Sequence, residues 1–231
     1  MKKLITTSLL AILASTTVEA QELDITITNL THGSHFTPLL VAAHAATTQL
    51  FAPGKTASAN LQAMAEGGDI SGLSSDVDAA GADKVANPAG GLLAPGASTS
   101  FSLSTQDGND YLSLVAMVLP TNDGFVGMNS LPIPTAAGSY TYQVNAWDAG
   151  TEANDEIVNG NGAPGMAGIP ADPLGKNGTG ATGVATADDN QNIHIHRGVI
   201  GDTDPAGGPS DLDSRIHRWL NPVASITITV K

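Results

Sequence analysis

Residues 23–28 read Leu-Asp-Ile-Thr-Ile-Thr, and residues 226–230 read Ile-Thr-Ile-Thr-Val. In both runs apolar and polar side chains alternate, which places all the apolar side chains of a β-strand on one face. This is the pattern of a strand that buries one face and leaves the other in water. The two runs therefore predict two half-buried strands, one near each end of the sequence.

Six further strand candidates lie between these two runs. They are short, and clusters of Gly, Pro and Asn, which favour turns, separate them. Eight short strands with little helical pattern between them favour a sandwich of antiparallel strands. We therefore predict an all-β fold, an antiparallel β-sandwich of about eight strands with one or two short helices. The six candidates are residues 39–44, 99–103, 111–119, 125–128, 140–147 and 192–196.

Helical spacing is confined to one part of the chain. Residues 58–66 place Leu61 and Met64 on one helical face, and the two glycines at 67–68 supply a left-handed stop. A weaker helical pattern continues over residues 70–77. We expect these short helices to close an end of the sandwich.

Residues 153–191 form a long Gly-rich segment with no hydrophobic period, and eight glycines lie between residues 160 and 183. A structureless loop of this length is uncommon inside a compact domain. Two interpretations remain open. The segment is either a mobile surface insertion, since long loops cost little to close, or a loop fixed by a ligand or metal.

The first 20 residues have the pattern of an export signal. Lys2 and Lys3 precede a short apolar run, and Val18-Glu19-Ala20 has the small-residue spacing of a cleavage site. The apolar run is shorter than the roughly 20 residues that span a bilayer. We predict a signal peptide over residues 1–20 and one domain over residues 21–231. The protein is then secreted or periplasmic, with no transmembrane segment after cleavage.

Composition limits the possible partners. The chain has 22 Asp and Glu against 9 Lys and Arg, a formal net charge of −13 and no cysteine. This charge repels nucleic acids and anionic membranes but attracts metal cations. Without disulfides, a large apolar core or a bound metal must supply the stability of an exported protein.

Three acidic residues are the best metal-ligand candidates. If the strands predicted between residues 111 and 147 are successive and antiparallel, the first and third run in the same direction. The loops that follow them leave the sandwich at the same edge, which brings Asp123 and Asp148 together. Glu152 follows four residues after Asp148, across Gly150, and is close enough to add a third carboxylate.

Carboxylates that lie together need a positive partner, because like charges repel and raise each other's pKa. No Lys or Arg occurs between Lys84 and Lys176, so the nearby sequence offers none. Calcium is a natural substitute because it accepts six to eight oxygen ligands in a flexible geometry. The alternative is that Asp123 and Asp148 are ordinary turn residues that bond their own backbone.

Two stretches of this region resemble the signature of the spondin domain family. They are Val-Leu-Pro-Thr-Asn-Asp-Gly-Phe-Val-Gly at residues 118–127 and Ala-Trp-Asp-Ala-Gly-Thr-Glu at residues 146–152. In that family the corresponding stretches read approximately Pro-Ser-x-Asp-Trp-Phe-Val-Gly and Trp-Asp-Ala-Gly-Thr-Asp. Weaker similarity to exported bacterial members extends over most of residues 21–231.

The resemblance implies a β-sandwich with calcium held in loops at one end, in an extracellular module of matrix attachment and cell adhesion. Carried over by position, the metal-binding acids are Asp123, Asp148 and Glu152. Two positions differ: Gly124 replaces a frequent Trp, and Glu152 replaces a frequent Asp. A longer carboxylate can still ligate calcium.

Three histidines offer a competing site. His194 and His196 alternate along a predicted strand, and His217 follows about twenty residues later. Three imidazoles can build a zinc or copper site. No cysteine accompanies them, and packed or surface imidazoles are the common case.

Motifs for a serine elbow, a phosphate-binding loop, a zinc protease or a cysteine nucleophile are all missing from the sequence. We therefore predict a calcium-binding, non-enzymatic module for adhesion or for binding an extracellular or envelope macromolecule. Two alternatives remain open. One is a secreted metal-dependent enzyme that uses the acids or the histidines, and the other is a structural envelope protein.

Overall fold

The computed structural model describes residues 20–231 except 176, 186, 188 and 189. The predicted signal peptide falls almost entirely on residues outside this part of the chain. The elements in chain order are β1 (Glu22–Asn29), β2 (His35–Phe36), β3 (Leu40–His44), α1 (Ala59–Gly67), α2 (Ser71–Ala79), β4 (Asp83–Ala86), β5 (Ser98–Ser104), β6 (Tyr111–Leu119), β7 (Gly124–Pro132), β8 (Gly138–Asp148), β9 (His194–Ile195) and β10 (Ala224–Val230).

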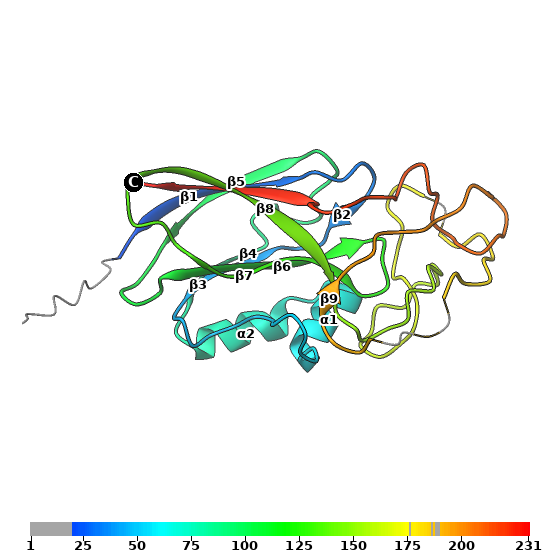
Figure 1. The fold of residues 1–231 in the computed structure, drawn as a ribbon, viewed down its shortest axis with the longest axis horizontal. Helices are drawn as coiled ribbons and strands as arrows, with labels where there is room; N and C mark the ends of the chain where they lie inside the picture. The colour runs from blue at the N-terminus through cyan, green and yellow to red at the C-terminus, as the bar shows by residue number, and fades with distance from the viewer. Residues whose placement is uncertain (1–19, 176, 186, 188–189) are drawn as a thin grey trace, which may run out of the picture.

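Antiparallel strands form two layers that the long strand β8 joins (Figure 1). Residues 138–144 of β8 pair with β10, and β1 and β5 continue that layer. Residues 145–148 of β8 pair with β7, and β6, β3 and β4 continue the other layer. Eight strands lie along this path, and the two-residue strands β2 and β9 attach beside it. The predicted antiparallel sandwich with two short helices is confirmed.

The two alternating runs pair with each other as β1 and β10. Ile25 lies opposite Ile228, and burial alternates along both strands, with the isoleucines inside and the threonines outside. The apolar side chains of both layers meet between them in one core. Apolar and polar residues therefore alternate along these strands because one face of the layer packs on the core and the other faces water.

Strand β6 does not alternate because it is buried on both faces. Leu112 and Leu114 point into the core between the layers, whereas Val115 and Met117 contact a second apolar cluster on the opposite face. The helices α1 and α2 supply that cluster with residues such as Leu61, Met64, Leu73 and Val77.

The helices thus cover the outer face of the β6 layer, as Figure 1 shows, and the expectation that they close an end was wrong. Helix α1 begins where the Ser58 hydroxyl accepts a hydrogen bond from the Leu61 N–H, at 3.1 Å. It ends at Gly68, which has a φ of 72°. Within the described residues, neither helix is long and apolar enough to cross a membrane.

The described residues between 149 and 222, here called the loop end, gather beyond one end of the sandwich (Figure 1). Their only named strand within the described residues is β9, shorter than the predicted strand over 192–196. Buried carboxylates hold this region by accepting hydrogen bonds from backbone N–H groups. Glu156, for example, accepts from the N–H groups of Ile200 and Gly201 and from the Ser210 hydroxyl. Glu156 thus links the start of the Gly-rich segment to residues 200–210.

Candidate functional site

The strand order brings Asp123 and Asp148 together at the end of the sandwich that carries the loops. Asp123 lies in the turn between β6 and β7, and Asp148 is the last residue of β8. Gly124 pairs with Asp148 across the two strands, so the two acids come from adjacent backbone positions. Both side chains are fully buried. The sequence prediction that these two carboxylates converge is confirmed.

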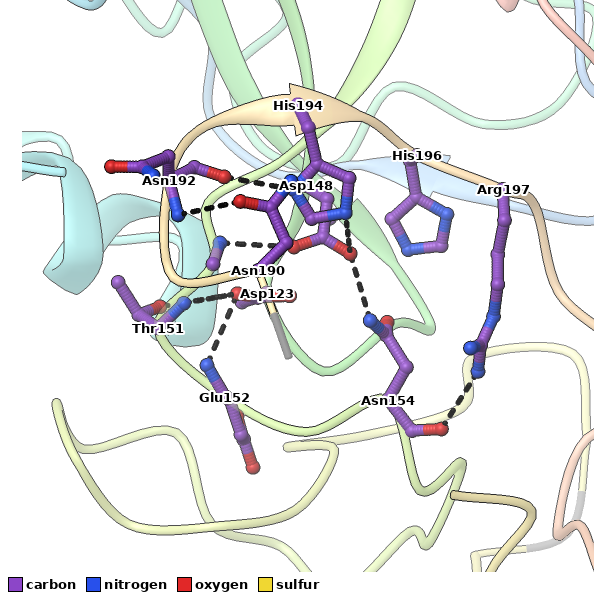
Figure 2. A network of polar contacts seen from close by, with 12 residues as sticks. Asp123, Asp148, Thr151, Glu152, Asn154, Asn190, Asn192, His194, His196 and Arg197 are labelled. Atoms are coloured by element: carbon purple, nitrogen blue, oxygen red, sulfur yellow. Dashed lines mark hydrogen bonds and ion pairs between the residues drawn. The ribbon is translucent and has the colours of Figure 1, made fainter. Parts of the chain in front are cut away.

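Backbone groups of the segment after β8 fix the Asp123 carboxylate (Figure 2). Oδ2 accepts hydrogen bonds from the Thr151 N–H at 2.8 Å, the Thr151 hydroxyl at 3.2 Å and the Glu152 N–H at 3.2 Å. Oδ1 is buried and has no hydrogen-bond partner among the described residues. One oxygen of Asp123 is therefore occupied, and the other is buried without a donor.

The neighbours of the Asp148 carboxylate include Gly150, Asn154 and His194. Oδ1 accepts from the Gly150 N–H at 2.9 Å, and Oδ2 accepts from the Asn154 side-chain amide at 2.7 Å. His194 Nε2 lies 3.8 Å from Oδ2, and β9 brings His194 opposite Asp148. Histidine is a positive partner only when it is protonated.

The two carboxylates disfavour each other's charge. The pKa of Asp123 is raised to about 8, first because burial destabilises the ionised form and second because Asp148 lies close by. The hydrogen bonds from Thr151 and Glu152 act in the opposite direction but do not outweigh these effects. No described cation contributes to the shift. Asp123 thus has the electrostatics of a buried acid that lies beside a second carboxylate.

The third predicted ligand, Glu152, contributes its backbone to this site, but its side chain points elsewhere (Figure 2). Its Oε1 accepts a short hydrogen bond from the Gly168 N–H and a longer one, 3.4 Å, from the Asn122 amide. The pKa of Glu152 is raised to about 7, chiefly by burial, with added repulsion from Glu66 and Asp155. Across the described residues, no three His, Asp or Glu side chains converge closely enough to hold an ion as they stand.

The three histidines do not form one cluster. His194 lies beside Asp148, and His196 packs on Trp219 with 5.0 Å between ring centroids. His217 is buried elsewhere, with Nε2 3.1 Å from Asp172 Oδ1 but not aligned for a hydrogen bond. A cavity of about 290 Å³ adjoins His217 and Asp172 and is not lined by Asp123, Asp148 or Glu152. Within the described residues, these three histidines therefore do not assemble the competing His-based site.

Sequence reasoning missed the residues that orient the acids. Asn154 bonds Asp148 and in turn accepts from the Arg197 guanidinium through its carbonyl, at 3.1 Å. Asn122 bonds Glu152 and Asp155. The only signal for Asn122 was its position beside Asp123. Asn154 and Arg197 lie in segments without a regular hydrophobic pattern, so nothing in the sequence indicated their placement.

The chain matches no curated protein. The model of the spondin N-terminal domain family, Spondin_N, matches residues 28–161. This range is more than half of the chain and contains Asp123, Asp148 and Glu152, as well as strands β2 to β8. The protein therefore belongs to the spondin N-terminal domain family.

Proposed function

We propose that this protein is an exported, calcium-binding module whose loop end is organised by calcium held between Asp123 and Asp148. Spondin N-terminal domains are extracellular modules of the adhesion or binding type. The proposal adds a ligand and a location to that general role. It includes a signal peptide at residues 1–20, one domain over 21–231, and a secreted or periplasmic destination.

The single observation that carries the calcium proposal is the buried Oδ1 of Asp123, which lies close to a second buried carboxylate, that of Asp148. Asp123 Oδ1 has no hydrogen-bond partner among the described residues, although it is buried. Leaving such an oxygen unsatisfied costs about 1–3 kcal/mol, and more for a charged group. A hard divalent cation satisfies the oxygen and offsets the repulsion between the two acids. The residues present therefore fit calcium, with backbone carbonyls and water as the usual further ligands.

Hydrogen bonds within the chain fix the orientation of the two proposed ligands. Thr151 and Glu152 hold one oxygen of Asp123 through their N–H groups, while Gly150 and Asn154 hold Asp148. Calcium supplies the positive charge that ties the β6–β7 turn to the segment after β8. Glu152 is the proposed third ligand, and its carboxylate must turn from its present position to serve.

The proposed partner is an extracellular or envelope macromolecule that meets the loop end. Strand β10 lies outside the family match but between β1 and β8 in the sheet. A fragment that ends at residue 161 would leave both of those strands with an unpaired edge. We therefore propose that residues up to 231 belong to the same folding unit.

Isothermal titration calorimetry with calcium tests the proposal directly. The wild-type protein should bind one calcium ion at this site, and Asp123→Asn and Asp148→Asn should each abolish binding. Asp76→Asn is the matched control, because it removes one acid from the exposed surface of α2. Circular dichroism confirms that each variant is folded. Binding that survives in both Asp123→Asn and Asp148→Asn would refute the site, and no binding by the wild type would refute the function.

A further inference from the structure

Glu152 belongs to two networks that lie on opposite sides of its backbone. Its N–H donates to Asp123 Oδ2 at 3.2 Å, within the proposed calcium site. Its carboxylate points away from that site (Figure 2). There it accepts a hydrogen bond from the N–H of Gly168. The same residue therefore links the two acids to a segment of the Gly-rich loop.

The acidic residues near the Glu152 carboxylate are not the two aspartates of the proposed calcium site. Glu66 and Asp155 repel it, whereas Asp123 is repelled by Asp148. Its Oε2 is buried and has no hydrogen-bond partner among the described residues. A carboxylate with one unsatisfied oxygen and two acidic neighbours has a poor environment for a charge. A bound cation would therefore offer the ionised carboxylate a more favourable environment than this position does.

Two glutamates hold the tip of the Gly-rich loop. Glu66, on α1, accepts from the Gly165 N–H at 2.6 Å through Oε2, and Glu152 accepts from the Gly168 N–H. Between these points lies Met166, which is 54% exposed. The base of the loop has separate contacts, because the Ile169 N–H donates to the Ile157 carbonyl and the Asn159 N–H donates to the Ile169 carbonyl. Losing one glutamate contact thus frees the Gly168 amide without detaching the loop base.

We propose that Glu152 is a calcium-sensitive latch that holds either the Gly168 N–H or the calcium bound by Asp123 and Asp148. This inference rests on the proposed function, since calcium binding at the two aspartates is its trigger. The carboxylate cannot face Gly168 and the two aspartates at once, because they lie in different directions from its backbone. Calcium binding therefore releases the Gly168 amide and changes the surface formed by residues 163–168.

Amide NMR on the isotope-labelled protein tests the latch with an internal control. Hydrogen exchange is measured at Gly168 and Gly165, first in chelator and then in saturating calcium. Loss of a hydrogen bond to a charged group should speed exchange at Gly168 by about tenfold or more. Exchange at Gly165 should stay unchanged, because Glu66 is not part of the calcium site.

Two variants sharpen the test. In Glu152→Asp the carboxylate is one methylene shorter, so Gly168 should exchange fast in chelator already and should not respond to calcium. In Glu152→Gln the uncharged amide oxygen can keep the bond to Gly168, and calcium should release it much less. The unchanged Gly165 amide shows that each variant is folded.

The outcomes separate the latch from the calcium site. If calcium raises the thermal midpoint and Gly168 exchange stays the same, the latch is refuted and the calcium site stands. If Gly168 and Gly165 respond equally, calcium acts on the whole loop and the latch is likewise refuted. If calcium changes neither the midpoint nor any amide, the proposed function fails together with the latch.

Discussion

The sandwich and the loop end differ in what fills their interiors. Between the two layers of the sandwich, apolar side chains from β1, β3, β6, β8 and β10 pack together. In the interior of the loop end, individual carboxylates accept hydrogen bonds from several backbone N–H groups. Asp211 accepts from Val158, Ala181 and both donor groups of Thr179. The first region is held by many interchangeable contacts, and the second by a few specific ones.

This difference assigns separate roles to the two regions. Apolar packing has no direction, so the sandwich tolerates exchange of similar side chains and serves as a scaffold. Hydrogen bonds to a buried carboxylate are directional, and each removed partner leaves unsatisfied groups. Acids that hold the loop end also accumulate negative charge there, which favours a cation. Three predictions test the comparison.

The largest expected effect is in the sandwich core. Ile226→Ala removes a fully buried side chain between the layers and should lower the free energy of unfolding by about 2–5 kcal/mol. Its neighbour Thr227 faces outward and bonds the Thr141 hydroxyl, so Thr227→Ala should cost at most about 1 kcal/mol. Denaturant unfolding measures both. Equal losses in the two variants would mean that the core does not dominate stability.

A smaller and more local effect is expected at Asp211. Asp211→Ala leaves the N–H groups of Val158, Thr179 and Ala181 without their acceptor, which should weaken their protection by about 1–3 kcal/mol. Asp211→Asn keeps one acceptor oxygen and should lose less. Hydrogen exchange measures the change at each amide. If exchange in β1 and β10 rises as much as in the loop end, the two regions do not differ in the way described.

The smallest expected effect is a change in the free energy of unfolding with pH. It comes from His196, at the junction of the two regions. Its pKa is lowered to about 3, first by burial and then by the charges of Arg197 and His194. Between pH 6.5 and 3 the unfolded chain binds a proton at this residue that the folded protein rejects. Stability should therefore fall with decreasing pH in this window, by up to about 1.4 kcal/mol per unit.

Two measurements check the His196 prediction. The imidazole NMR signals of His196 should stay constant from pH 8 to 5, and a normal titration in that range would contradict the prediction. His196→Leu should weaken the pH dependence of unfolding relative to the wild type. The variant also loses the 2.9 Å hydrogen bond from the Gly198 N–H to Nδ1, so only the slopes are compared.

The fold could be predicted from sequence wherever buried apolar residues recur at the regular spacing of a strand. The alternation in residues 23–28 and 226–230 correctly indicated β1 and β10, and turn residues separated most of the other strands. The position of α1 and α2 could not be predicted in the same way. Strand β6 has apolar residues on both faces, and only the structure shows that the helices cover one of them.

The candidate site was predictable only in part. Strand order was enough to bring Asp123 and Asp148 together, since it fixes which strand ends meet. The direction of the Glu152 side chain depends on the Gly168 amide, which lies in a segment without a period. His217 was grouped with His194 and His196 by spacing alone, but long loops place it beside Asp172.

Unfolding of the wild-type protein in calcium and in chelator tests the central claim most directly. At a calcium concentration about a hundred times the dissociation constant, the free energy of unfolding should rise by roughly 2.7 kcal/mol if only the folded state binds. The rise should vanish in Asp123→Asn and Asp148→Asn and persist in Asp76→Asn. The same stability of the wild type in both conditions, or a rise that persists in both site variants, would contradict calcium binding by these two residues.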